Sequence, residues 1–352
     1  PRTLAAMPSP ALTAWRERGR IVRVFEHDLF VVDEPARAPA PRTAIVVLHG
    51  YPSSSLDLRP ALPLLAAQRR VVVHDHPGFG LSARPTNYDY TLIDQAEHAL
   101  GVWRALGIER AHLVAHDYGT SVATELIARR ERGLLPIELA SLTLCNGSMH
   151  IELARLKLTQ KLLKHRTFGP LLARLTSKRL FVAQMRSILG DPAAVSEAEL
   201  ELHFELLLHN DGRRHLAAVS RYHEDRWRFW HRWIGALTRL DLPTHVLWGR
   251  RDPVAVPAIA EVLGEPAKPL YRRLDRIFAT LRRQMRGQAG CCAFDFRHFV
   301  EQADGTVNAV VKSVPAVAEE NMARQFARER RFHFRHLRFD QRMTGLPHDG
   351  LA

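Results

Sequence analysis

Short apolar runs rich in β-branched residues alternate with longer amphipathic stretches, and this alternation constrains the fold more than any other feature. The runs predict strands at residues 21–25, 29–32, 44–48, 71–74, 112–115, 142–144 and 245–248. The stretches between them, such as 92–106 and 121–132, carry apolar residues at helical spacing. Strands that alternate with helices form a mostly parallel sheet covered on both faces, so the predicted fold class is α/β. The first two runs lie close together and predict an antiparallel hairpin at one edge.

The alternation stops after the sixth run. From about residue 149 to 235 leucines recur at helical spacing, and aromatic residues gather toward the end of this segment. We expect a helical cap at 149–235, inserted between the two parts of a core at 12–148 and 236–310. The basic tail at 311–352 has no assigned structure.

Composition adds three expectations. The chain of 352 residues is 46% hydrophobic, which is enough apolar material for a sizeable core. Its three cysteines, Cys145, Cys291 and Cys292, form neither a disulfide framework nor a zinc spacing, which favours a cytoplasmic location. No run of ~18 apolar residues occurs, so no integral membrane segment is expected.

The formal net charge of +13 comes almost entirely from arginine, since only six lysines occur. Such a charge fits nucleic acid or an anionic membrane, and it equally fits a solvated surface that uses arginine as its cation. No nucleic-acid-binding motif accompanies it. We therefore expect a small-molecule substrate and no nucleic acid. Peripheral contact with an anionic surface and the oligomeric state stay open.

The stretch LVAHDYGTSVA (113–123) places a carboxylate directly after a run that predicts a buried strand. Burying an unpaired charge is costly, so Asp117 either caps a helix or lies where something reacts. Ala115 and Gly119, both small, lie two positions before and two after it. This spacing is the steric requirement of a sharp strand-to-helix turn that exposes the central side chain. Ligands of open parallel sheets bind at the carboxyl ends of strands, which favours a reactive Asp117.

An aspartate at this turn changes the chemistry that a serine would perform. Its carboxyl is ordinarily ionised at neutral pH and needs no base to attack. It suits attack on an electrophilic saturated carbon that bears a leaving group, and the product is an alkyl ester that water must hydrolyse. Because that second step needs a histidine base and an acid to orient it, the motif predicts two partners further along the chain.

Four segments together resemble the α/β-hydrolase family, in its haloalkane dehalogenase and epoxide hydrolase branch. VVLHGYPSSS (46–55) is similar to the oxyanion segment, DHPGFGLS (75–82) to the turn after the following strand, HDYG (116–119) to the nucleophile elbow, and WGRRDPV (248–254) to the acid loop. The opening WRERGRIVRVFEHDLFVVDE and the later RYHEDRWRFWHRWIGAL further resemble the mesoderm-specific-transcript group. The resemblance covers about residues 12–260 and implies an α/β-hydrolase fold with an inserted helical cap.

The resemblance implies a role for each matching residue. Asp117 is the expected nucleophile and Asp252 the orienting acid, although an aspartate before a proline also suits a plain turn. The backbone N–H groups of Tyr51 and Tyr118 are expected to form the oxyanion hole. HFVEQADG (298–305) places His298 as the base, but an arginine precedes it where the family has glycine, and nineteen histidines leave other choices open.

The leaving group separates the candidate functions. Dehalogenases of this branch typically have Trp after the nucleophile and often Asn after His-Gly, where this chain has Tyr118 and Tyr51. Epoxide hydrolases use cap tyrosines as proton donors, and Tyr222 is the candidate, with a merely packed aromatic as its alternative. We expect an epoxide-hydrolase-like enzyme that acts on a small apolar substrate through a covalent alkyl-enzyme ester. The alternatives are a haloalkane dehalogenase and a catalytically silent binding protein. No metal or other cofactor is expected, since His74, Asp75 and His76 fit a turn network.

Overall fold

The structure, a computed structural model, describes residues 8–37, 42–193 and 195–263. Its strands form one sheet in the order β1-β2-β4-β3-β5-β6-β7. Their bounds are β1 (Arg20–Val24), β2 (His27–Glu34), β3 (Ala44–Leu48), β4 (Val71–His74), β5 (Arg110–His116), β6 (Glu138–Cys145) and β7 (Thr244–Leu247). β1 and β2 form an antiparallel hairpin, β2 also pairs antiparallel with β4, and the remaining neighbours are parallel.

The seven strands lie where the apolar runs predicted them, and the edge hairpin is confirmed. β5 and β6 begin before the predicted runs, at Arg110 and Glu138, because their first residues pair with each other at the exposed ends of the strands. The mostly parallel α/β sheet is therefore confirmed.

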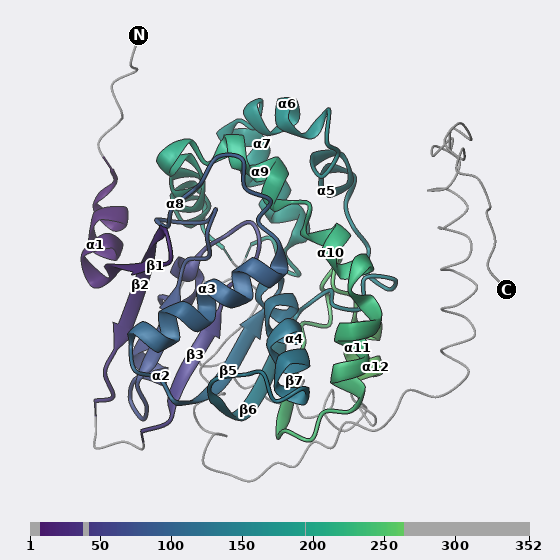
Figure 1. Cartoon of the computed structure of the whole chain (residues 1–352). Coiled ribbons are helices and arrows are strands. Elements are labelled where there is room, and N and C mark those ends of the chain that lie inside the picture. Colours follow the sequence, from purple (N-terminus) through teal and green to yellow (C-terminus); the bar gives the residue numbers. More distant parts are fainter. Residues whose placement is uncertain (1–7, 38–41, 194, 264–352) are drawn as a thin grey trace, which may run out of the picture. The chain divides into compact units, whose positions relative to one another are not determined.

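The central strands are buried on both faces, which explains their unbroken apolar character. In β3, Val46 belongs to one core cluster, while Ile45 and Val47 belong to another on the opposite face. Helices cover both faces (Figure 1). Those outside the β6–β7 connection are α1 (Pro10–Arg18), η1 (Ser55–Leu58), α2 (Leu62–Leu65), α3 (Leu92–Ala105), α4 (Tyr118–Glu131) and α12 (Pro257–Leu263).

Among its described residues, the connection between β6 and β7 contains helices joined by turns, and no strand. They are α5 (Leu158–Leu163), α6 (Gly169–Arg174), α7 (Lys178–Ile188), α8 (Glu197–Leu208), η2 (His209–Asp211), α9 (Arg213–Val219), α10 (Tyr222–Arg228) and α11 (Trp230–Thr238). We call this set the inserted helices. Helices α6 to α9 share a small apolar cluster, which includes Phe181, Phe204 and Leu216, whereas α10 and α11 pack into the main core through residues such as Tyr222 and Trp233. The last helix ends at Thr238, slightly beyond the predicted limit of 235.

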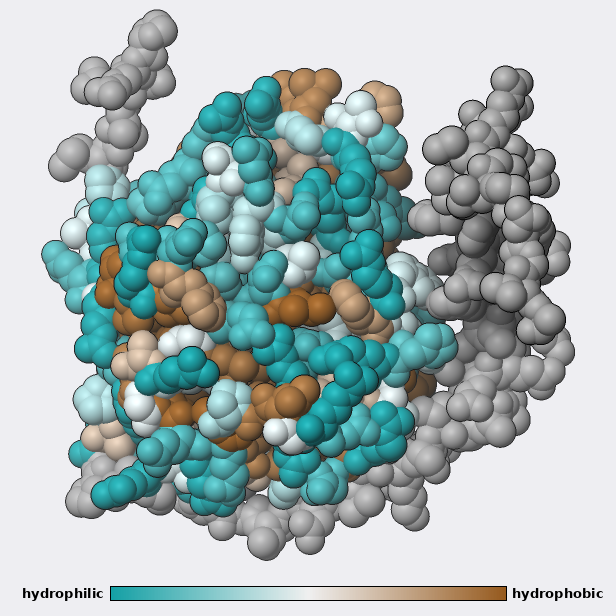
Figure 2. All heavy atoms as spheres, in the orientation of Figure 1, coloured by the Kyte–Doolittle hydropathy of each residue, from teal (hydrophilic) through white to brown (hydrophobic). Residues whose placement is uncertain are grey.

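The fold brings the carboxyl ends of β3, β5, β6 and β7 to one edge. In Figure 1 the inserted helices α5 to α9 lie over that edge, whereas α11 lies beside α4. Hydrophobic atoms lie at the top of Figure 2, where α6 lies in Figure 1. Within the described ranges, no helix combines the length and apolar character needed to span a bilayer. The last part of the expected core, residues 264–310, lies outside the described residues, as does the tail at 311–352.

Candidate active site

Asp117 lies at the turn between β5 and α4, at the carboxyl edge of the sheet. Its φ of 45° and ψ of −105° fall in a sparsely populated region for a residue with a side chain. Such a conformation costs on the order of 1–3 kcal/mol and persists only where the surroundings impose it. The Asp117 N–H donates to the carbonyl of Cys145 at 3.0 Å, which fastens the turn to the end of β6.

Close backbone approach explains the small residues around Asp117. A Cβ placed on Gly119 would lie 2.4 Å from the carbonyl oxygen of Leu48 in β3. One placed on Gly50 would lie 3.0 Å from both Asp117 Cβ and His116 Nδ1. The Gly119 N–H also donates to the carbonyl of His49 at 3.0 Å. The elbow and the loop after β3 are therefore packed backbone against backbone.

The loop after β3 aims a donor at the Asp117 carboxylate. The Tyr51 N–H donates to Asp117 Oδ1 at 2.8 Å. Tyr118 is the first residue of α4, and an amide in this position has no acceptor within its own helix. Of the two backbone groups predicted for the oxyanion hole, the Tyr51 N–H thus contacts the Asp117 carboxylate, and the Tyr118 N–H follows Asp117 directly at the start of α4.

Buried hydrogen bonds hold this loop in place. His49 bonds the carbonyl of Gly50 through Nδ1 at 2.8 Å and accepts the His76 N–H through Nε2 at 3.0 Å. Burial lowers the pKa of His49, so the ring is a neutral structural group. Asp75 accepts the N–H groups of Ser55 and Leu81, each at 2.7 Å. No cluster of metal-ligating side chains occurs in the described parts of the chain.

Asp252 lies in the loop after β7 with three donors on its carboxylate. Oδ2 accepts Asn146 Nδ2 at 2.7 Å, and Oδ1 accepts the N–H groups of Val254 at 2.8 Å and Ala255 at 2.7 Å. Burial nevertheless raises the pKa of Asp252, the negative charge of Asp117 raises it further, and these hydrogen bonds oppose the rise. The structure thus brings Asp252 within electrostatic range of Asp117.

Asn146, which the sequence analysis missed, connects β6 and β7. Its Nδ2 donates to Asp252, and its Oδ1 accepts the Gly249 N–H at 2.9 Å. The residue has a φ of 43°, which asparagine tolerates better than most residues. Its position directly after the strand that neighbours β5 is the signal that could have identified it.

Tyr222 of α10 packs on the two tyrosines of the predicted oxyanion hole. Its ring centre lies 4.8 Å from that of Tyr118 and 5.5 Å from that of Tyr51. Burial raises the pKa of Tyr222 well above its ordinary range, so the phenol stays protonated at neutral pH. The charge of Asp117 contributes to this rise, which places Tyr222 and Asp117 within electrostatic range.

Arg226, a second residue that the sequence analysis missed, lies one helical turn after Tyr222. The side chain is fully buried, with its guanidinium carbon 4.5 Å from the centre of the Tyr222 ring. Nε donates to Ser121 Oγ at 2.7 Å, while Nη1 and Nη2 have no hydrogen-bond partner among the described residues. The positive charge lowers the pKa of Tyr222 against the larger effect of burial. No signal in the sequence separates this arginine from the many others.

Two pockets meet at Tyr51, Pro52 and Leu216. The larger holds about 510 Å³ of space, part of it open to solvent, between Tyr51 and the inserted helices. Apolar side chains line most of it, including Leu163, Phe181, Met185 and Ile188.

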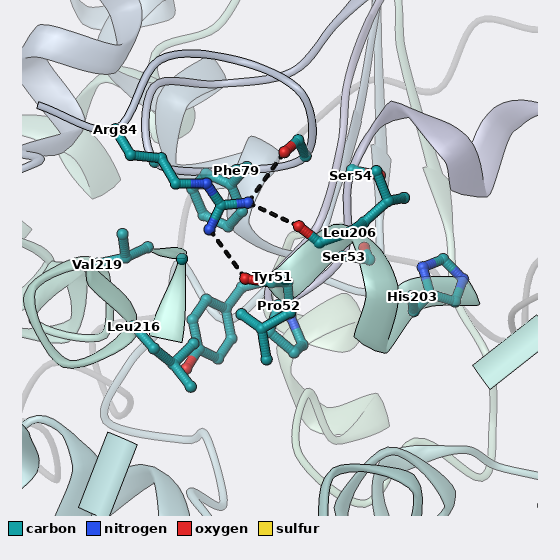
Figure 3. Close-up of a pocket in the computed structure, with 14 residues that line it drawn as sticks. Tyr51, Pro52, Ser53, Ser54, Phe79, Arg84, His203, Leu206, Leu216 and Val219 are labelled. Atoms are coloured by element: carbon teal, nitrogen blue, oxygen red, sulfur yellow. Dashed lines mark hydrogen bonds between the residues drawn. The ribbon is translucent and has the colours of Figure 1, made fainter. Parts of the chain in front are cut away.

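The smaller pocket holds about 350 Å³ and is shown in Figure 3. There the Arg84 guanidinium donates to the carbonyls of Gly80, Leu206 and Leu207, at 2.9, 2.9 and 3.3 Å. Burial lowers the pKa of Arg84 to about 10, which leaves it charged at neutral pH. These bonds join the turn after β4 to the end of α8.

The sheet order, the aspartate elbow and the inserted helices agree with one known architecture. A family model described as alpha/beta hydrolase fold matches residues 43–269. The chain belongs to the α/β-hydrolase fold family. It is a hydrolase of this fold, and several of its relatives are named as hydrolases.

Two relatives of this α/β-hydrolase cover most of its length. LipZ of Mycobacterium tuberculosis, named as a hydrolase, is 38% identical over 260 residues, which cover 74% of this chain and 88% of LipZ. The mesoderm-specific transcript protein of Mus musculus is 33% identical over 253 residues, covering 70% and 75% of the two chains. The resemblance to that group is confirmed.

Solved structures agree on the fold. The haloalkane dehalogenase DbeA from Bradyrhizobium elkani matches with a TM-score of 0.57 and 22% identity over 71% of this chain and 85% of that one. The epoxide hydrolase CorEH matches with a TM-score of 0.53 and 16% identity over 66% and 82%. At these identities the two structures establish the shared fold alone.

One predicted member of the α/β-hydrolase site lies outside the described residues. His298, expected as the base, falls beyond residue 263, and its role stays a prediction from the sequence. The structure brings together the other five predicted residues, namely Tyr51, Asp117, Tyr118, Tyr222 and Asp252.

Proposed function

We propose that this hydrolase opens epoxides through a covalent ester on Asp117. The observation that carries the proposal is the Asp117 carboxylate at a strained, backbone-packed turn with the Tyr51 N–H 2.8 Å from Oδ1. A carboxylate at this position needs no base to act as a nucleophile. Two backbone amides beside it suit the negative charge that forms when the ester is later hydrolysed.

The first step forms the ester. An Asp117 oxygen attacks one epoxide carbon, the bond from that carbon to the ring oxygen breaks, and the ring oxygen takes the phenolic proton of Tyr222. The product is an alkyl ester with a neighbouring hydroxyl group. Burial keeps Tyr222 protonated, as a proton donor must be, and the charge of Arg226 opposes part of the rise in its pKa.

The second step hydrolyses the ester. A water molecule attacks the acyl carbon of Asp117 and gives a proton to His298, whose imidazolium Asp252 would orient. The N–H groups of Tyr51 and Tyr118 hold the oxyanion. Its collapse breaks the ester bond, and the departing alkoxide takes the proton held by His298. The remaining proton of the attacking water returns to the Tyr222 phenolate through solvent, which restores the Asp117 carboxylate and releases the diol. Three donors hold the Asp252 carboxylate in a fixed orientation, from which it could orient the His298 imidazolium.

The side chains beside Asp117 favour an epoxide over a halide. The Tyr51 hydroxyl already bonds Ser220 Oγ at 2.7 Å. The Tyr118 ring is fully buried against Phe79, His76 and Tyr222. The Tyr51 hydroxyl is thus already engaged by Ser220, whereas an opening epoxide requires only the proton of Tyr222.

Arg226 supports the role of Tyr222 as an acid. A phenol that gives up its proton in a buried site becomes an anion, and an unpaired buried anion is costly. The guanidinium above the Tyr222 ring supplies a compensating positive charge. Among the described residues this guanidinium forms no ion pair with a carboxylate.

The pocket beneath the inserted helices is lined mostly by apolar side chains, which suits a small apolar substrate, and these helices would act as its cap. We also propose a cytoplasmic location, because the three cysteines form no disulfide framework.

Single turnover of an epoxide panel in heavy-oxygen water tests the proposal. In the first turnover the oxygen added to the product should come from Asp117 and carry no label, and label should enter the carboxylate instead. Direct entry of label into the first product would overturn the nucleophile assignment. Release of halide from haloalkanes, with no epoxide turnover, would select the dehalogenase alternative, and no turnover of either class would select a silent binding protein.

A further inference from the structure

The inserted helix α6 is amphipathic in the reverse sense, with its large apolar side chains facing solvent. Phe168, Leu171, Leu172 and Leu175 follow helical spacing and are 61%, 58%, 37% and 65% exposed. The opposite side carries Gly169 and Ala173, both buried. A Cβ on Gly169 would lie 2.1 Å from the Leu163 carbonyl oxygen, so the small side of α6 is the side that packs inward.

Neighbouring helices extend this exposed stripe. Leu158 and Leu162 of α5 are 69% and 44% exposed, and Leu180 of α7 is 44% exposed. Together with the four side chains on α6 they form what we call the outer apolar patch. Seven of the eleven exposed large hydrophobic residues in the described ranges therefore lie between 158 and 180. Hydrophobic atoms over α6 are visible at the top of Figure 2. An apolar group of this kind marks an interaction site more often than an accident of folding.

The surroundings of the patch are basic. Residues 153–190 contain nine lysines and arginines and no acidic residue, and four of the six lysines in the chain lie there. Acidic residues of other inserted helices pair with three of the nine cations, in the pairs Arg166–Glu224 at 3.4 Å, Lys178–Glu201 at 2.7 Å and Arg186–Glu197 at 3.8 Å. The other six have no ion pair within the described residues, and they are Arg155, Lys157, Lys161, Lys164, Arg174 and Arg179.

These two properties together identify the partner. A second copy of the chain would bring like charges together across the patch, which disfavours self-association. A water-soluble protein partner would need an apolar centre and an acidic rim of matching shape. An anionic bilayer offers an apolar interior and a continuous layer of phosphates without any matching of shape.

We propose that the outer apolar patch docks this protein on an anionic membrane surface. Phe168, Leu171 and Leu175 enter the headgroup region, and the surrounding lysines and arginines contact lipid phosphates. The docking does not depend on the catalytic proposal. The same helices line the 510 Å³ pocket on their inner side through Gln160, Leu163 and Phe181, so docking would set that pocket beside lipid, where apolar substrates concentrate.

Vesicle flotation of the full chain tests the docking. Vesicles of phosphatidylcholine alone are compared with vesicles that also contain phosphatidylglycerol. We expect binding to the anionic vesicles that weakens as salt is added, because salt screens exposed charges. Hydrogen–deuterium exchange on those vesicles should show new protection in residues 158–175.

Matched substitutions test the location. Leu171→Ser with Leu175→Ser should weaken vesicle binding about tenfold or more, because two apolar side chains lose their burial in lipid. Lys161→Gln with Arg174→Gln should weaken it about twentyfold, on the basis of about fivefold per cation. Leu134→Ser and Arg132→Gln remove an equally exposed leucine and an exposed arginine near the amino end of β6, at the other end of the sheet, and should leave binding unchanged.

Three outcomes would overturn the proposal. The first is no binding to anionic vesicles. The second is binding that survives both pairs of substitutions with protection outside residues 158–175. The third is self-association that the patch substitutions abolish while vesicles bind nothing. None of these outcomes involves turnover, so the reaction on Asp117 would stand or fall separately.

Discussion

Asp117 and Tyr222 carry the two halves of the proposed reaction, and the molecule positions them by different means. Asp117 and its turn are held by backbone contacts with the ends of neighbouring strands. Leu48 is the last residue of β3, Tyr51 lies three positions after it, and Cys145 is the last residue of β6. Tyr222 is held by ring packing and by a buried cation from the same helix. Backbone contacts follow from the order of strands and tolerate little change. Side-chain packing depends on the whole set of inserted helices, so this half of the site can diverge while the sheet half persists.

The largest expected effect is at the elbow. Asp117→Asn keeps the shape of the side chain and removes the nucleophile, so turnover should fall on the order of 10⁴-fold or more. Asp89→Asn, whose side chain is 85% exposed, is the control and should turn over like the parent protein. Steady-state rates on the best epoxide measure both. Substantial activity in Asp117→Asn would show that Asp117 is not the nucleophile.

The packing of the elbow should appear in stability. Gly119→Ala would force a Cβ to 2.4 Å from the Leu48 carbonyl oxygen, and we expect a loss of about 3 kcal/mol or more in the free energy of unfolding. Gly133→Ala is the matched control, since Gly133 has a φ of 69° and open space around it, and should lose only about 1 kcal/mol. Urea unfolding compares them. A loss in Gly119→Ala no larger than that in Gly133→Ala would mean that the close approach to Leu48 does not account for the glycine at 119.

The inserted half should show coupling between two side chains. Tyr222→Phe removes the proton donor and should slow ester formation about 100-fold, and Arg226→Met should slow it by about 10-fold or more. If Arg226 acts through Tyr222, adding Arg226→Met to Tyr222→Phe should cause little further loss. Rapid-quench kinetics of ester formation measures all three variants. Arg228→Met, an exposed arginine of the same helix, is the control. If the two losses in rate multiply in the double variant, Arg226 does not act through Tyr222.

The smallest expected effect concerns Asn146 and pH. The hydrogen bond from Asn146 opposes the rise in the pKa of Asp252, so Asn146→Ala should raise this pKa further. Asp252 must be charged to orient an imidazolium, and it loses that charge as pH falls through its pKa. The acid limb of ester hydrolysis should therefore move to higher pH, while the alkaline limb stays in place. An unchanged acid limb would place the acid of this site elsewhere than at Asp252.

The elements found by the sequence analysis are those whose signal is local. β3 and β4 were predicted at their observed bounds because a strand buried on both faces is a short unbroken apolar run. The elbow was located because Ala115 and Gly119 flank Asp117 at a fixed spacing. α1 was not predicted, and it packs through Leu12 and Trp15 on the sheet face opposite α3 and α4.

The missed site residues depend on contacts between distant segments. Asn146 meets Asp252 across 106 positions, and Arg226 meets Ser121 across 105. Arg226 differs neither by type nor by spacing from the other arginines of the chain, and the position of Asn146 directly after β6 gains its meaning only once β6 is known to lie beside β5 and β7. The leucines of α6 show the same limit in another way, because helical spacing predicted a helix but not which side would face solvent.

By itself, the sequence determined the α/β class, the order of strands and helices, the turn that carries Asp117, and a helical insertion before β7. Each of these follows from patterns within a few residues, where steric limits and the burial of apolar side chains act directly. Only the tertiary structure decided that Tyr222 lies under a buried cation, that Asn146 holds Asp252, and that an apolar stripe points outward beside lysines. Those arrangements arise because distant segments compete for the same buried space, and the outcome of that competition is a property of the packed molecule as a whole.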